Sequence, residues 1–125
     1  MKPKSAKQKG RALQQLVIKR LIECLGINPQ DIENRSMGCG GEDIILSVSA
    51  RRAFPFSVEC KNQESVNVWN AYAQAESNQR NGEPLVIIKR NNHKPLAIID
   101  FDFLLELIKI NSILSSIKIE VKKCK

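Results

Sequence analysis

The segment 56–61 alternates strictly between apolar and polar residues. Successive side chains of a β-strand point to opposite faces of its sheet, so this period of two predicts a strand whose faces differ in polarity. Phe56, Val58 and Cys60 take one face, and Ser57, Glu59 and Lys61 take the other. The preceding segment 43–48 is rich in β-branched residues, and we expect it to form an antiparallel pair with 56–61.

Helices and further strands are predicted around this pair. Apolar residues recur at spacings of three and four from about Gln8 to Leu25, which indicates a helix with one buried face. A second helix is predicted over 66–80, and a third runs from a cap at Asp100 or Asp102 to about Ile110.

The remaining strands complete a sheet. A short strand is predicted within 28–35, and the apolar runs 84–89 and 95–99 indicate buried strands joined by a turn at Asn91-Asn92. The tail 113–121 alternates only loosely. The order α-β-β-β-α-β-β-α predicts an α/β fold in which helices flank a mixed central β-sheet.

The composition indicates one globular domain, which we expect to span residues 8–125. Of the 125 residues 42% are apolar, a share that is typical of folded domains and too high for a disordered chain. The most apolar stretch, Phe101–Ile119, contains four charged residues, which argues against a membrane-spanning helix. No secretion signal is recognisable, so we expect a cytoplasmic protein.

The net charge of +7 lies entirely near the N-terminus. The first 20 residues hold seven Lys and Arg residues and no acid, whereas 21–125 hold equal numbers of basic and acidic residues. We expect residues 1–7 to form a flexible basic arm that attracts a polyanion such as DNA. Arg51, Arg52 and Arg80 would add phosphate contacts.

Two cofactor patterns are missing from the sequence. The cysteines form no CxxC pair and His93 has no second ligand at zinc spacing. Cys24 and Cys60 fall at apolar positions of a helix and a strand, and we expect them to be buried free thiols. The glycine-rich turn 36–41 lacks the Gly-Lys-Ser/Thr ending of a P-loop, so we expect no nucleotide cofactor.

Asp43, Glu59 and Lys61 form the most informative cluster. Glu59 and Lys61 leave the same face of their strand, and Asp43 begins the strand expected beside them. Two converging carboxylates are oxygen ligands of the kind that Mg²⁺ prefers, and the backbone carbonyl of Cys60 would add another. Lys61 would orient or help to deprotonate an attacking water, which predicts a metal-dependent hydrolytic site.

The same cluster also fits a solvated strand face without a catalytic role. The segment 120–122 repeats the Glu-x-Lys form, with Asp100 and Asp102 upstream. A predicted helix separates this second copy from its aspartates, so we place the candidate site at the first copy.

The order and spacing of several motifs resemble the PD-(D/E)XK nuclease superfamily. Gly38-x-Gly40-Gly41-Glu42-Asp43 is followed by Glu59-x-Lys61 and then by a helix that carries Gln74. Lys9-Gly10-Arg11 and Arg35-Ser36-Met37-Gly38 are similar to motifs of small archaeal Holliday junction resolvases, and phage-encoded endonucleases share the general layout. The resemblance covers roughly residues 9–80.

This resemblance implies a restriction-endonuclease-like core and a DNA endonuclease that depends on Mg²⁺, with Mn²⁺ as a substitute. Asp43 and Glu59 would bind the metal and Lys61 would assist the nucleophile. DNA would contact five further residues, Lys9, Arg11, Ser36, Gln63 and Gln74. Paired cuts in two strands would require a homodimer, because they need two sites related by symmetry.

The first helix departs from the resolvase pattern. Those enzymes carry a glutamate early in this helix, where the present chain has Gln14 and Gln15, and Glu23 follows two turns later. Either a ligand is missing, or Gln15 does a weaker version of its job. A second hypothesis therefore stays open, a non-catalytic nucleic-acid-binding module. A third, an accessory protein that binds an acidic partner, leaves the Asp43 cluster unexplained.

Overall fold

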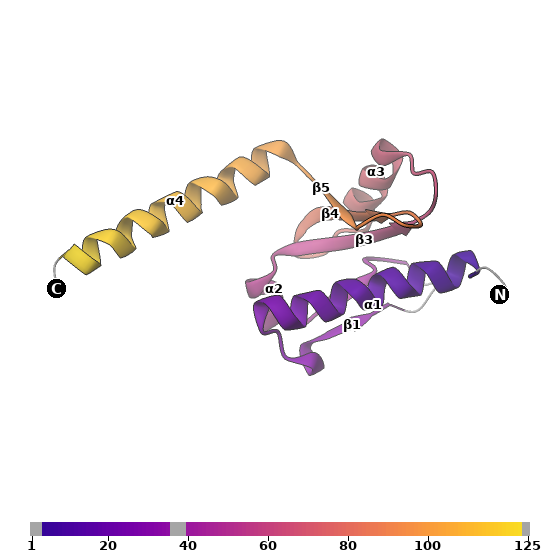
Figure 1. Cartoon of the computed structure of the whole chain (residues 1–125), viewed down its shortest axis with the longest axis horizontal. Coiled ribbons are helices and arrows are strands. Elements are labelled where there is room, and N and C mark those ends of the chain that lie inside the picture. The colour runs from indigo at the N-terminus through magenta and orange to yellow at the C-terminus, as the bar shows by residue number, and fades with distance from the viewer. Residues whose placement is uncertain (1–3, 36–39, 124–125) are drawn as a thin grey trace.

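The computed structural model describes residues 4–35 and 40–123, with side chains as far as residue 117. Its elements in chain order are α1 (Ala6–Leu25), the 3₁₀ helix η1 (Pro29–Asp31), β1 (Ile32–Asn34), β2 (Ile44–Leu46), α2 (Val48–Ala53), β3 (Phe56–Asn62), α3 (Val68–Asn78), β4 (Glu83–Lys89), β5 (Leu96–Ile99) and α4 (Phe101–Lys123). The chain is an α/β protein with a body formed by α1 to β5, from which α4 projects (Figure 1).

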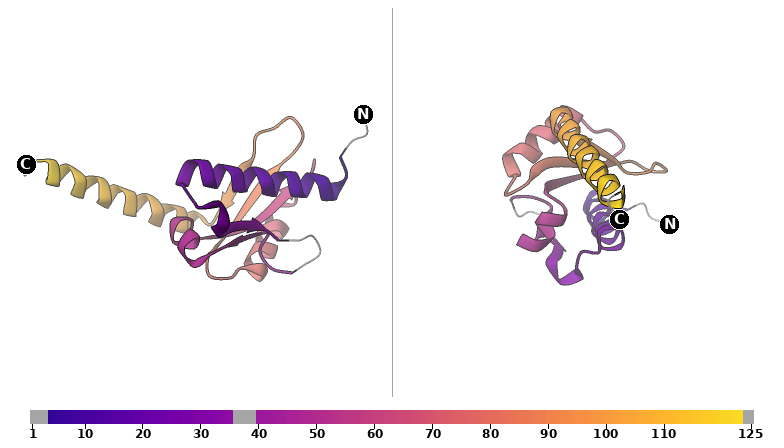
Figure 2. Two further views of the ribbon diagram at one scale, coloured as in Figure 1. Left: turned by 90° about the horizontal axis from the view of Figure 1, so that it is seen from below. Right: turned by 90° about the vertical axis from the view of Figure 1, so that its left-hand side faces the viewer.

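A mixed three-stranded sheet forms the centre of the body. β3 and β4 are parallel, and β5 is antiparallel to β4. α3 makes the crossover that the parallel pair requires. The turn between β4 and β5 includes Asn92, which adopts a positive φ of 60°. α1 packs against one face of the sheet and α3 against the other (Figures 1 and 2).

The predicted antiparallel pairing of 43–48 with 56–61 is wrong. β2 pairs instead with β1, in a separate two-stranded ribbon. The side chain of Ser47 accepts a hydrogen bond from the backbone N–H of Ala50 and so caps α2. This cap turns the chain into a helix before a hairpin with β3 can form. Together with η1, α2 is an element that the predicted order does not contain.

Both faces of β3 are buried, including the polar one. Phe56, Val58 and Cys60 belong to the core beneath α1, as the alternation predicts. Ser57 and Glu59 are only 2% and 3% exposed. β3 lies between β4 and Asp43, whose N–H donates to the carbonyl of Val58. The polar face is covered by α3, which packs against β3 and β4 and whose Gln74 accepts a hydrogen bond from Lys61.

Two helices are longer than predicted. α1 begins at Ala6, because Ser5 and Gln8 form a reciprocal capping box, so the last two residues of the predicted arm are helical. α4 continues to Lys123, and the end predicted near Ile110 is wrong. The tail beyond Ile110 keeps apolar residues at helical spacing, which the loose alternation concealed. The predicted cap at Asp100 is confirmed, since its side chain accepts a hydrogen bond from a backbone N–H in the first turn of α4.

Cys24, expected to be buried, lies on the surface at the end of α1, whereas Cys60 is buried as predicted. Trp69 of α3 is also 85% exposed, because α3 packs on the sheet through its small residues Ala71 and Ala75. Within the described residues no helix has a stretch that is long and apolar enough to cross a bilayer.

Candidate functional site

Asp43 is fixed at the edge of β3 by hydrogen bonds from two directions. Its backbone N–H donates to the carbonyl of Val58, and its own carbonyl accepts from the N–H of Arg35, both at 2.9 Å. Its side-chain Oδ2 accepts a hydrogen bond of 2.7 Å from the backbone N–H of Cys60. The Asp43 carboxylate therefore has a defined position beside Glu59.

Glu59 is almost fully buried, and one of its oxygens lacks a partner. Its Oε1 lies 3.3 Å from Nζ of Lys61. Its Oε2 is buried and accepts no well-formed hydrogen bond, although the side chain of Asn78 lies near enough to the carboxyl to lower its pKa. An unpaired buried polar atom costs about 1–3 kcal/mol, and more when the group is charged. Such an atom is expected where a site receives a ligand.

Lys61 is held between the acid cluster and α3. Its Nζ donates a hydrogen bond of 2.7 Å to Oε1 of Gln74 while it contacts Glu59. The predicted face of Glu59 and Lys61 thus meets the helix that carries Gln74. Lys61 contacts Glu59 directly, and the charges of Lys61 and Arg35 both act on Asp43.

The local electrostatics oppose the charged forms of both acids. Burial raises the pKa of the Asp43 carboxyl above its ordinary value, against the opposing effects of the Cys60 N–H and of the Lys61 and Arg35 charges. Burial, followed by the charge of Asp43, raises the pKa of Glu59. Burial also raises the pKa of the Cys60 thiol far above its ordinary value, which keeps it protonated and unsuited as a nucleophile.

A cavity of about 260 Å³ opens onto the acid cluster. Its lining joins the start of α1 to the end of β3 and consists of Ala6, Lys7, Gly10, Gln14, Asp43, Glu59, Cys60, Lys61, Asn62 and Gln63. The structure places the three residues that could replace the glutamate of the resolvases' first helix in different surroundings. Gln14 is buried in the cavity wall. Gln15, expected as the possible substitute for the glutamate, is instead exposed, and its amide donates to Oδ1 of Asn34 at 3.4 Å. Glu23 forms an exposed pair with Lys19 at 4.0 Å.

Some of the predicted DNA contacts lie at this cavity and others do not. Gln63 lines it, and Gln74 reaches it through the hydrogen bond to the lysine. Lys9 lines an adjoining cavity of about 400 Å³ on the other side of Asn62. Arg11 is exposed on α1, and Ser36 lies outside the described residues.

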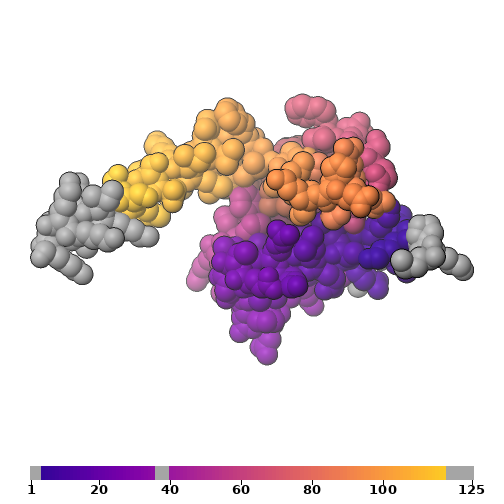
Figure 3. Space-filling model, viewed as in Figure 1, coloured from indigo at the N-terminus to yellow at the C-terminus, as the bar shows by residue number. Residues whose placement is uncertain are grey.

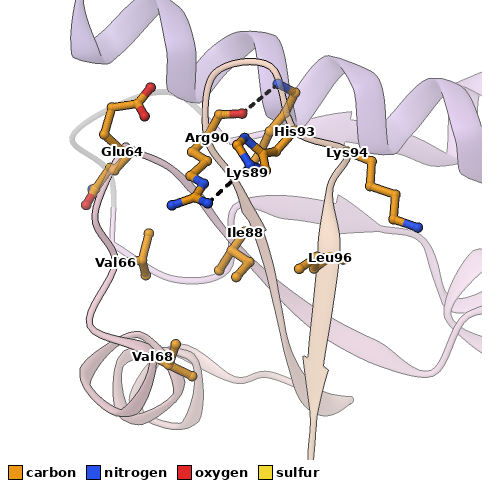
Figure 4. A pocket seen from close by; sticks show the side chains of 10 residues that line it. Glu64, Val66, Val68, Ile88, Lys89, Arg90, His93, Lys94 and Leu96 are labelled. Atoms are coloured by element: carbon orange, nitrogen blue, oxygen red, sulfur yellow. Dashed lines mark hydrogen bonds between the residues drawn. The ribbon is translucent and has the colours of Figure 1, made fainter.

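A third cavity, of about 270 Å³, adjoins the site at Gln63 (Figure 4). Apolar side chains of Val66, Val68, Ile88 and Leu96 and cationic side chains of Lys89, Arg90 and Lys94 line it together with Glu64 and His93. Nη2 of Arg90 lies 3.1 Å from Nε2 of His93. Sequence reasoning missed this cavity, because its lining comes from a loop, α3, β4, a turn and β5, which no single motif connects.

Glu42 belongs to a separate, closed cluster that the sequence analysis also missed. Its two oxygens accept hydrogen bonds of 2.6 Å from Nη2 of Arg51 and Oγ of Ser57. Nη1 of Arg51 donates to the carbonyl of Phe56 at 2.9 Å. Arg51, predicted as a phosphate contact, is therefore engaged inside the protein, while Arg52 and Arg80 are exposed. The one sequence feature that pointed to the Glu42 cluster is the polar face of β3, because Ser57 lies on the same face as Glu59.

The candidate site rests on its own geometry. In the part of the chain that the structure describes, no group of three or more His, Cys, Asp or Glu side chains is placed to hold a metal ion. Two carboxylates with water and substrate oxygens remain compatible with Mg²⁺, which usually keeps several non-protein ligands. Comparison with protein-family models, curated proteins and solved structures found no match for this chain.

Proposed function

We propose that this protein is a divalent-metal-dependent DNA endonuclease with a restriction-endonuclease-like core. The observation that carries the proposal is Oε2 of Glu59, a buried carboxylate oxygen without a partner, in the same cavity wall as Asp43. The resemblance of the motifs around these residues to PD-(D/E)XK nucleases gives the same assignment.

The residues of the site fit a divalent cation. Asp43 and Glu59 offer hard oxygen ligands, and Cys60, whose backbone carbonyl would be the third ligand, lines the same cavity. Burial raises the pKa of both carboxyls, the charge of Asp43 raises the pKa of Glu59 further, and a positive charge between the two groups would oppose these shifts. When bound, Mg²⁺ supplies an activated water and offsets the charge that develops on the phosphate.

Lys61 and Gln74 position the groups that act on the phosphodiester. Lys61 lines the cavity, and its Nζ contacts both Gln74 and Glu59. From this place Lys61 orients the attacking water and stabilises negative charge in the transition state. Gln14 contributes an uncharged amide to the same wall, where the resemblance places a glutamate.

The three adjoining cavities provide a path for the DNA backbone. Each two of the three cavities share one of these lining residues, Asn62, Gln63 or Lys89, so the cavities adjoin one another near the ends of β3 and β4. Seven cationic side chains line them: Lys4, Lys7, Lys9, Lys61, Lys89, Arg90 and Lys94. Phosphates bound along this path release counterions, so DNA binding should weaken steeply as salt rises.

A cleavage assay tests the proposal. Purified protein is incubated with Mg²⁺ or Mn²⁺ and supercoiled plasmid, a flap substrate and a four-way junction. We expect cleavage of at least one substrate, and a loss of about 100-fold or more in Asp43→Asn and Glu59→Gln, because a catalytic metal is worth several kcal/mol of transition-state stabilisation. Glu33→Gln, which removes an exposed carboxylate from β1, is the matched control and should cleave like the parent.

Intact substrates at every metal and salt concentration would contradict the proposal, as would equal cleavage by Asp43→Asn. The small number of acidic ligands favours one alternative, a non-catalytic nucleic-acid-binding module. That function predicts salt-sensitive DNA binding that is indifferent to metal and unchanged in Glu59→Gln.

A further inference from the structure

The cavity that adjoins the acid cluster at Gln63 has an apolar wall. Val66 and Leu96 lie on either side of Ile88, and Val68 is supplied by the start of α3 (Figure 4). Val66 and Ile88 pack against the core between α3 and the sheet, so the body of the protein holds this wall in place. Val68 and Leu96 are 38% and 53% exposed, so apolar surface of the wall remains in contact with water.

The mouth of this cavity is fixed by hydrogen bonds. Oε1 of Glu64 accepts a hydrogen bond of 3.0 Å from the N–H of Asn91, which joins the loop after β3 to the β4–β5 turn. Nδ1 of His93 lies 2.8 Å from the carbonyl of Asn91, and its Nε2 lies 3.1 Å from Nη2 of Arg90. A carbonyl only accepts and a guanidinium only donates, so His93 is the neutral tautomer with its proton on Nδ1, and it positions Arg90.

The charged side chains at the mouth favour an anionic ligand. The β4–β5 turn lies on the surface of the body (orange in Figure 3) and exposes Arg90 and Lys94. Together with Lys89 they outnumber the acid Glu64, which is engaged with the backbone of the turn. A phosphate group alone would use these cations and leave the apolar wall in water. A ligand that uses both parts carries a negative charge beside an apolar face, as a nucleotide does.

The apolar wall favours a base that has left the base stack. In duplex DNA the faces of the bases cover one another, and a protein reaches only their edges in the grooves. An unstacked base exposes its faces, and unstacking costs least where the base is already unpaired. A volume of about 270 Å³ lies near the lower end of the range for small-molecule sites, which suits one base rather than a run of bases.

We propose that this cavity binds a single unstacked nucleobase beside the scissile phosphate, so that the substrate is DNA with an unpaired nucleotide near the cut. Gln63 lines both this cavity and the cavity of the acid cluster, which places the base close to the bond that is cut. The phosphates that flank the base contact Lys89, Arg90 and Lys94. The inference rests on the proposed function and adds the class of substrate to it.

DNA binding without metal tests this inference separately from cleavage. The full chain is titrated in EDTA, at fixed salt, against two labelled duplexes that carry one extra nucleotide at the same position, either an adenine nucleotide or an abasic one. The two probes have the same phosphates and differ in the base. Fluorescence anisotropy should show about 10-fold or more tighter binding of the adenine probe, because the base removes apolar side chains from water. Equal affinities, or no binding of either probe, would overturn the inference.

Leu96 and Ile108 provide a matched pair of variants. Both residues are 53% exposed, but Leu96 lines the cavity whereas Ile108 lies on α4. Leu96→Gln should reduce the preference for the base to about 2-fold or less, because the apolar wall is lost, and should leave the affinity for the abasic probe unchanged. Ile108→Gln should keep the preference of the parent.

A second wall variant, Val68→Gln, covers the case in which the change at Leu96 disturbs β5. It should lose the preference for the base in the same way, and a preference that survives in both wall variants would overturn the inference. A preference for the base without any cleavage in Mg²⁺ or Mn²⁺ would contradict the endonuclease and leave the base site standing. Cleavage by a parent that binds both probes equally would overturn the base site alone.

Discussion

Glu42 and Asp43 are neighbours in the chain, yet they belong to carboxylate clusters of opposite character. Both oxygens of Glu42 accept short hydrogen bonds, from Arg51 and Ser57. The cluster that Asp43 forms with Glu59 and Lys61 leaves Oε2 of Glu59 unpaired. Ser57 and Glu59 stand two apart on the same face of β3, so one strand face supplies a member to each cluster.

This difference separates a structural charge from a functional one. A buried carboxylate that is fully paired contributes to the definition of the fold, and its removal leaves a buried guanidinium without compensation. A buried carboxylate that is partly paired costs stability in the absence of a ligand, and its retention points to a ligand. We therefore expect substitutions in the two clusters to change stability in opposite directions.

The largest effect is expected for Glu42→Ala. The side chains of Arg51 and Glu42 are only 13% and 5% exposed, so the variant would leave the Arg51 guanidinium buried and unpaired. Breaking a buried pair in this way costs about 3–5 kcal/mol. Urea denaturation measures the change in the free energy of unfolding. A loss below about 1 kcal/mol would show that the Glu42 cluster is not the closed network described above.

A smaller loss of unfolding free energy is expected for Gly82→Ala, because the added methyl group would crowd the Glu42–Arg51 network. A Cβ at Gly82 would lie 2.7 Å from the carbonyl carbon of Phe56 and 2.9 Å from Nη1 of Arg51. Such crowding typically costs about 1–3 kcal/mol. Gly40→Ala is the matched control, because a Cβ there has no atom within 4 Å. Equal unfolding free energies of the two variants would contradict the close packing around Arg51.

The smallest change in stability is expected for Glu59→Gln in the absence of metal, and this change should be a gain. The folded state raises the pKa of Glu59, so it holds the proton more tightly than the unfolded chain, and stability falls as pH rises from about 4.3 through the folded pKa. The neutral amide of the Glu59→Gln variant does not ionise, so its stability does not fall in this way as pH rises. The variant should melt a few degrees higher at pH 7, and the gain should vanish below about pH 4. A lower melting temperature at pH 7 would mean that Glu59 is as well paired as Glu42.

The sequence predicted the acid cluster better than the sheet around it. Period-two alternation fixed which residues of 56–61 share a face, and that is enough to bring Glu59 and Lys61 together. It carries no information on which strand lies alongside. The partner of β2 was decided by the Ser47 cap, which starts α2, and the partner of β3 by the crossover through α3.

Other features depend on contacts that no local pattern reports. The Glu42–Arg51–Ser57 network joins three segments through side-chain geometry, and Gln14 enters the cavity wall only because α1 packs across the end of β3. The length of α4 was missed for a different reason. Apolar residues lie on several sides of this helix, so the sequence of the tail 113–121 resembles a loose alternation of apolar and polar residues.

The most direct test of the central claim is Mn²⁺ binding measured by electron paramagnetic resonance on the parent, Glu59→Gln and Glu33→Gln. We predict one bound Mn²⁺ per chain in the parent, an affinity at least about 10-fold weaker in Glu59→Gln, and no change in Glu33→Gln, since Glu59 supplies the open oxygen. Absence of bound Mn²⁺ in the parent at millimolar concentrations, or equal affinity in Glu59→Gln, would contradict the account.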